Sequence, residues 1–162
     1  MCFNILQARF CVRGWERFSG GYGKVGWMKV YRSNLSKLPG RSYNDVERTA
    51  RKLHRAIERR TKRTPYVKSV YFQNQKVFLN VFWTHLNQKP RADRKRRLKL
   101  YALAIDLIEN SRVVPLTKDN PNGKNERVHR MAGVSKENEV FYVQIKEDAK
   151  GRKYFMSVFL PK

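Results

Sequence analysis

The sequence is short of acidic residues, of cysteine and of long apolar segments. Only 13 of its 162 residues are Asp or Glu, against 36 Lys and Arg, so the formal net charge is +23. The two cysteines, Cys2 and Cys11, do not stand in the Cys/His spacing of a zinc site. No apolar run approaches the roughly 20 residues that cross a membrane, and the opening residues lack the order of a secretory signal. We therefore expect a cytoplasmic protein with reduced thiols, no metal or other cofactor, and no membrane partner.

The remaining composition is that of a folded domain. Hydrophobic residues make up 41% of the chain and aromatic residues 12%, which excludes a disordered basic tail. A positive charge of this size on a folded protein predicts a polyanionic partner. Nucleic acid is the first candidate, and an anionic membrane or an acidic inhibitor protein are the alternatives.

The glycine-rich stretch near the N-terminus has the spacing of a dinucleotide-binding loop at Gly21, Gly23 and Gly26. Such a loop needs a strand before it and a helix after it, and here an extended stretch follows, so we reject the motif. We interpret residues 1–27 as an N-terminal extension, appended or flexible, and residues 28–162 as a single α+β domain.

The middle of the chain predicts helices and a hairpin. Residues 42–63 have the apolar spacing of a helix, with Ser42 and Asp45, or Asn44 and Glu47, as its capping pair. Residues 66–73 and 76–83 are rich in aromatic and β-branched residues and predict two strands. A second helix has Pro90 at its first position, and its apolar part, residues 98–108, is expected to pack on the sheet.

The segment 78–99 joins a predicted strand to this basic helix, with His85 at the junction. Seven of the eleven residues from Lys89 to Lys99 are Lys or Arg. Cations at a helix N-terminus oppose the helix dipole, so their clustering favours a functional role, although a solvated helix start is the simpler explanation.

The end of the chain predicts a second hairpin, formed by residues 140–146 and 152–160, after a long connection at residues 111–130. Strict alternation would place Tyr142, Lys153, Phe155 and Ser157 on an open aromatic and polar face. The expected fold is α+β, a four-stranded, mostly antiparallel sheet packed by two main helices, with a basic cleft.

The candidate chemistry is RNA cleavage without a metal. It needs a base for the 2′-hydroxyl proton, cations for the phosphorane and an acid for the leaving oxygen. A histidine titrating near neutrality suits the first or last role, and clustered carboxylates, which a two-metal site needs, are missing. The candidate catalytic residues are His85, Lys89, Arg127, His129 and Ser157.

Each candidate also has a structural explanation. His85 could end a strand, His129 could belong to a basic loop without catalysis, and Ser157 could be an ordinary strand serine. The candidate RNA-binding residues supply cations and stacking surfaces, and they are Arg91, Arg94, Arg97, Tyr142, Lys153 and Phe155.

The order of these elements, with the short pieces FWTHL, ERVHR and FYVQIKED...KGRKYFMSVF, resembles the barnase/EndoU/colicin/RelE-like nucleases, particularly their phage- and toxin-associated branches. The resemblance covers about residues 43–160. It implies a metal-independent endoribonuclease, often a toxin held by an acidic antitoxin or immunity protein. The chain departs from barnase in lacking an evident Glu base paired with a His.

The sequence therefore predicts an endoribonuclease toxin that cleaves tRNA or mRNA by 2′-hydroxyl transesterification. The alternative is a non-catalytic RNA- or DNA-binding module, which needs only the charge and a stacking surface. A structural protein neutralised by an acidic partner is a third, minor possibility.

Overall fold

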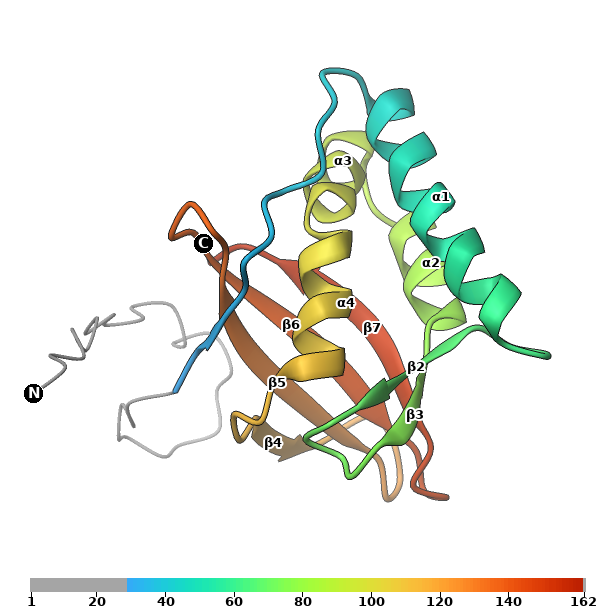
Figure 1. Ribbon diagram of the computed structural model, residues 1–162. Coiled ribbons are helices and arrows are strands. Elements are labelled where there is room, and N and C mark those ends of the chain that lie inside the picture. Colours follow the sequence, from blue (N-terminus) through green and yellow to red (C-terminus); the bar gives the residue numbers. More distant parts are fainter. Residues whose placement is uncertain (1–28, 162) are drawn as a thin grey trace, which may run out of the picture.

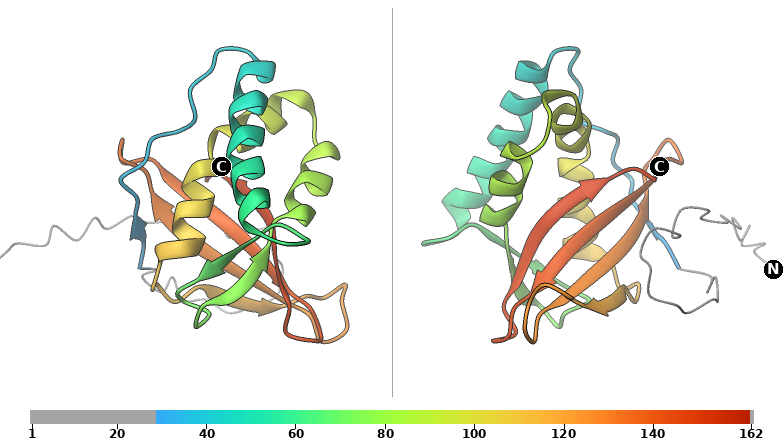
Figure 2. Two further views of the ribbon diagram at one scale, coloured as in Figure 1. Left: turned by 45° about the vertical axis from the view of Figure 1, so that its right-hand side comes forward. Right: turned by 180° about the vertical axis from the view of Figure 1, so that it is seen from behind.

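The computed structural model describes residues 29–161. The expected extension, residues 1–27, lies outside the described residues. The described chain forms a curled, mixed sheet with helices packed on one of its faces (Figure 1). We call the helix-covered face of the sheet the inner face and the opposite one the open face. Seen from behind, no helix of residues 29–161 covers β5, β6 and β7 on the open face (Figure 2).

The sheet has seven strands among the described residues, in the order β1-β5-β6-β7-β3-β2, with β4 also paired to β5. Two pairs, β1 with β5 and β3 with β7, are parallel, and the others are antiparallel. The strands are β1 (Tyr31–Arg32), β2 (Tyr66–Ser69), β3 (Gln75–Phe78), β4 (Leu116–Asp119), β5 (Arg127–Val134), β6 (Val140–Glu147) and β7 (Lys153–Phe159). The helices are α1 (Tyr43–Arg60), α2 (Asn80–Asn87), α3 (Arg91–Lys99) and α4 (Tyr101–Asn110).

The expectation of a four-stranded, mostly antiparallel sheet with two main helices is therefore wrong. Strand β4 lies inside the predicted long connection, and β5 begins in its last residues and continues beyond it. Strand β5 pairs with both β4 and β1 along one edge. Its C-terminal half is buried and small, so it lacks the alternation that marks a half-buried strand. A Cβ on Gly133 would lie 2.4 Å from the Phe141 ring and 2.7 Å from Leu107. Glycine is needed there because β6 and α4 approach the strand backbone closely.

The predicted strand over residues 76–83 is also wrong, because β3 ends at Phe78 and α2 begins at Asn80. Leu79, Phe82 and Leu86 are all buried at helical spacing. His85 accordingly lies within a helix rather than at the end of a strand. The helix predicted to begin at Pro90 is divided at Leu100 into α3 and α4.

Two local predictions are confirmed. Helix α1 begins with a capping box in which Ser42 and Asp45 exchange side-chain and backbone hydrogen bonds. The last two strands, β6 and β7, form the predicted hairpin. Their pairing contains a β-bulge, because Gln144 pairs with Ser157 while Ile145 pairs with Phe155. Met156 is the extra residue.

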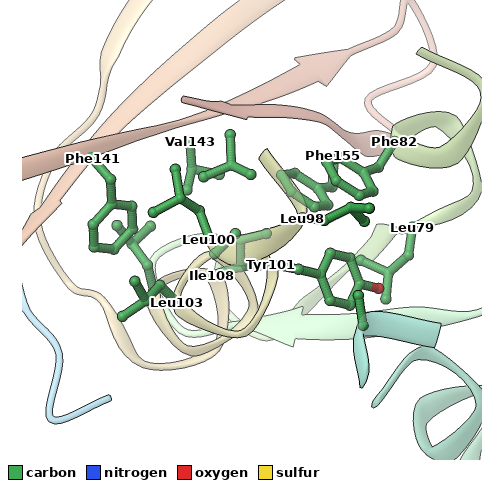
Figure 3. Close-up of a cluster of buried hydrophobic side chains, with 14 of the residues drawn as sticks. Leu79, Phe82, Leu98, Leu100, Tyr101, Leu103, Ile108, Phe141, Val143 and Phe155 are labelled. Atoms are coloured by element: carbon green, nitrogen blue, oxygen red, sulfur yellow. The ribbon is translucent and has the colours of Figure 1, made fainter. Parts of the chain in front are cut away.

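The core lies between the inner face of the sheet and the helices. Phe82 of α2 stacks on Phe155 of β7 with ring centroids 4.6 Å apart, and Tyr101 of α4 lies 5.2 Å from Phe82 (Figure 3). All three side chains are buried. This aromatic contact fixes α2 against β7 and so determines where His85 lies.

Candidate functional site

The candidate site is a cavity beside β7, at the place where that strand loses its partner β3. Strand β3 pairs with β7 only at Lys153 and Tyr154, and beyond that point α2 lies beside β7 (Figure 2). The cavity has a volume of about 310 Å³. Its lining residues come from α2, the α2–α3 connection, α3 and the three long strands, and they are Phe82, His85, Leu86, Lys89, Arg97, Arg130, Gln144, Met156, Ser157 and Phe159.

The charge of this lining has one sign. Three of its members, Lys89, Arg97 and Arg130, carry cations, and no carboxylate is among them. The apolar part of the wall includes two phenylalanines and Met156. A cavity of cations and aromatic rings suits a phosphorylated group that carries a flat base.

His85 is the titratable group of the cavity. Phe82 and Leu86 of the same helix are buried, whereas His85 is partly exposed. Burial and the positive charges of Lys89 and Lys146 lower the pKa of His85 below its ordinary value. The imidazole is therefore uncharged at neutral pH, the form that accepts a proton. Within residues 29–161 no side-chain hydrogen bond fixes its ring.

Arg97 and Ser157 form a hydrogen-bonded pair in the cavity wall. Arg97 Nε lies 2.9 Å from Asp93 Oδ2, and Nη1 donates to the Ser157 hydroxyl and, at 3.4 Å, to the Val158 carbonyl. Because the Ser157 oxygen accepts from Arg97, its own hydrogen can be donated to a bound group. The guanidinium is only 17% exposed, so it is held in place by the protein.

Arg130 and Gln144 belong to the site although they were not among the sequence candidates. They lie in one row with Ser157, since Arg130 pairs with Gln144 and Gln144 with Ser157 across β5, β6 and β7. Burial lowers the pKa of Arg130, and its guanidinium lies 5.4 Å from the Phe159 ring. The sequence of β5 does not alternate, so it is not recognised as a strand from the sequence. If it were, Arg130 would be placed on the open face.

His129 points away from the cavity, although it adjoins Arg130. It is 5% exposed and faces the inner side of the sheet, with Nδ1 2.8 Å from Thr117 Oγ1 and Nε2 3.0 Å from Glu147 Oε2. Its pKa is lowered by burial, against the opposing effect of Glu147. Arg127 lies at the far end of β5, opposite Glu147. Of the five candidate catalytic residues, Arg127 and His129 are therefore outside the cavity lining, which contains His85, Lys89 and Ser157.

Three residues of the predicted stacking surface are buried. Phe155 is fully buried in the core, Tyr142 is 3% exposed, and Lys153 is 6% exposed with Nζ 3.2 Å from Glu147 Oε2. The bulge at Met156 reverses the expected alternation for Phe155 and Lys153 of β7. Tyr142 of β6 is buried beside Phe159, with ring centroids 5.8 Å apart. Phe159 is the aromatic residue of β7 that reaches the cavity.

Arg91 and Arg94, in the first part of α3, make different contacts. Arg94 donates to the carbonyls of Asn87 and Lys89 at 2.7 and 2.6 Å, and so caps the end of α2. Arg91 lies 5.1 Å over the Tyr43 ring and 3.4 Å from Asn44 Oδ1 of α1. Of the three predicted RNA-binding arginines in α3, Arg97 alone lines the cavity.

Residues 29–161 contain neither a metal-binding cluster nor a membrane-spanning helix. No group of three or more His, Cys, Asp or Glu side chains is placed to hold a metal ion. No helix in this range has the length and apolar character needed to span a bilayer.

Comparison of the chain with protein-family models, with curated proteins and with solved structures finds no match. The nuclease resemblance stays a prediction.

Proposed function

We propose that the protein is a metal-independent endoribonuclease that cleaves RNA by 2′-hydroxyl transesterification. The observation that carries this proposal is the cavity lining, in which an imidazole with a lowered pKa lies among three cations and no carboxylate. Such a lining attracts a phosphodiester and supplies a proton acceptor beside it.

The roles follow from the chemistry of each side chain. His85 takes the proton of the 2′-hydroxyl, and Arg97 and Arg130 stabilise the charge of the pentacoordinate phosphorane. Ser157 donates its hydroxyl hydrogen to a phosphate oxygen while Arg97 holds the hydroxyl in place. Lys89, four residues after His85 in the α2–α3 connection, is our candidate donor for the leaving 5′-oxygen.

A cleavage assay in EDTA tests the proposal. Wild-type protein is incubated with total RNA, and the product ends are examined by mass spectrometry for 2′,3′-cyclic phosphate. We expect cleavage by wild type and strong losses in His85→Ala and Ser157→Ala. Thr84→Ala, an exposed change on the same helix that lies outside the cavity lining, is the matched control. No cleavage by wild type, or undiminished cleavage by His85→Ala, contradicts the proposal.

We further propose that the enzyme is a toxin that acts on tRNA or mRNA in the cytoplasm and is held by an acidic antitoxin or immunity protein. The net charge of +23 supports an acidic partner as well as a nucleic-acid substrate. Expression of wild type should arrest growth of a bacterial host, and expression of His85→Ala should not.

One observation favours the non-catalytic alternative, a basic RNA- or DNA-binding module. The cavity lining contains a single imidazole and no carboxylate, so proton transfer to the leaving group rests on Lys89 alone. A protein of this kind would shift RNA in a gel, leave it intact in the cleavage assay, and show steep salt dependence.

A further inference from the structure

Helix α1 carries a stripe of four cations, Arg48, Lys52, Arg55 and Arg59, that faces away from the protein. All four are exposed. They recur at spacings of four, three and four residues, and at about 100° per residue they lie opposite the buried side formed by Val46, Ala50 and Ile57. We call these four residues the α1 stripe.

The α1 stripe is not explained by the stability of the helix. Among residues 29–161 none of its four charged groups takes part in an ion pair or hydrogen bond. Like charges three and four residues apart repel and destabilise a helix. The acidic residues Glu47 and Glu58 lie off this side of α1, and Asp45 is engaged in the capping box. An external polyanion would relieve the repulsion.

Helix α1 is fixed to the two helices that line the cavity. Its Arg51 guanidinium lies 4.5 Å from the Trp83 ring of α2, and His54 packs edge-on against the same ring. At its other end, the ammonium of Lys95 in α3 donates to the Arg41 carbonyl. Helix α1 therefore packs against the helices that line the cavity, and it lies beside them in the fold (Figure 1).

A basic path connects the stripe to the cavity. Arg91 contacts Tyr43 and Asn44 in the first turn of α1, next to Arg48. Lys89, two residues before Arg91, is a member of the cavity lining. Arg91 and Lys89 are both exposed, so a phosphate backbone that leaves the stripe meets cations until it reaches the cavity.

The two surfaces suit different forms of nucleic acid. The α1 stripe spans about 16 Å at 1.5 Å per residue and carries no aromatic side chain among its four residues, so it offers phosphate contacts and no stacking surface. A double-stranded stem, whose bases are hidden, fits this surface. The cavity has Phe159 and Met156 in its wall and fits an unpaired base.

We propose that the α1 stripe binds the backbone of an RNA stem while the cavity holds an unpaired nucleotide beside that stem. The substrate class is thus structured RNA with a stem next to a single-stranded segment. This inference rests on the proposed function for the role of the cavity, but the stripe itself is tested by binding and needs no cleavage.

The test compares two variants that each lose four positive charges. The stripe variant carries Gln at residues 48, 52, 55 and 59. The matched control carries Gln in place of four exposed lysines outside α1, namely Lys68, Lys124, Lys136 and Lys150. Both are made in a His85→Ala background so that the RNA stays intact, and folding is checked by circular dichroism.

Affinity is measured for a stem-loop RNA of roughly 16 base pairs, for its loop sequence as a single strand, and for the matching DNA stem-loop. We expect the stripe variant to bind the stem-loop RNA at least about tenfold more weakly than the control does, with a salt slope reduced by about 0.9 for each lost phosphate contact. Binding of the single strand should be equal in the two variants.

Equal losses of stem-loop affinity in the two variants would show that the stripe acts only through net charge and would overturn the inference. An unchanged stem-loop affinity would overturn it too. Because the stripe makes phosphate contacts alone, the stripe variant should also bind the DNA stem-loop more weakly than the control does. These outcomes are separate from the cleavage assay: a protein that cleaves nothing can still bind stems through α1, and an active enzyme can lack this surface.

Discussion

Arg97 of α3 donates a hydrogen bond to the hydroxyl of Ser157 in β7, a residue 60 positions further along the chain. The same guanidinium is bound by Asp93 one turn earlier in α3. This pair joins the basic helix to the strand that lines the cavity.

Arg97→Lys should reduce RNA cleavage by roughly 10²-fold. Lysine keeps the positive charge but cannot donate to Asp93 and Ser157 from one planar group. Single-turnover cleavage rates provide the measurement. Arg96→Lys, at an exposed position outside the cavity lining, is the control and should be neutral. If both variants keep full activity, the fork geometry of Arg97 has no role in the reaction.

The cleavage rate should rise with pH, with the midpoint of the rise below the ordinary histidine pKa of about 6.5. The reason is that His85 acts when uncharged, and its pKa is lowered by burial, Lys89 and Lys146. Lys89→Gln removes one of these positive charges and should move the rise toward higher pH, besides lowering the plateau. The pH profile of kcat/KM measures both effects. Lys150→Gln, in the β6–β7 turn, should leave the midpoint in place, and a rate independent of pH would argue against His85 as the base.

The free energy of unfolding should fall as the pH drops below about 6.5. The pKa values of His54, His85 and His129 are all lowered, mainly by burial. The unfolded chain therefore binds protons in this range that the folded protein does not, so the stabilisation is complete above pH 6.5 and is lost on acidification. Thermal unfolding at pH 7.5 and 5.0 measures the effect, and His129→Gln should weaken the pH dependence. Equal melting temperatures at the two pH values would contradict this linkage.

Truncation of Phe155 should lower the stability of the protein, whereas truncation of Phe159, in the same strand, should weaken RNA binding. Phe155→Ala should cost about 3–5 kcal/mol of stability, because the ring is fully buried against Phe82. Phe159→Ala should change stability little and weaken RNA binding, since that ring lines the cavity between Arg97 and Arg130. Urea unfolding and RNA titration measure the two properties. A binding defect in a folded Phe155→Leu variant, with none in Phe159→Ala, would reverse the assignment.

The sequence predicts those parts of this fold that depend on local pattern. The apolar spacing and the Ser42–Asp45 pair define α1, and two runs of alternating residues define the β6–β7 hairpin. Of the residues that the sequence proposes for the chemistry, His85, Lys89 and Ser157 all line the cavity.

Other parts depend on tertiary contacts that leave no local pattern. Strand β5 is buried and packed around Gly133, so it shows no alternation. The short apolar run before His85 fits a strand and a buried helix equally well, and only the contact between Phe82 and Phe155 decides for the helix. Arg130 was missed as a consequence of missing β5.

The bulge at Met156 lets β7 direct one side chain into the core and a neighbouring one into the cavity. Phe155 and Ser157 are two residues apart, and in a regular strand they would share a face. The extra residue lets Phe155 enter the core while Ser157 meets Arg97 in the cavity. Deletion of Met156 would remove this freedom, and one of the two side chains would have to leave its place. The number of residues in β7 is therefore constrained more tightly at this point than the identity of residue 156.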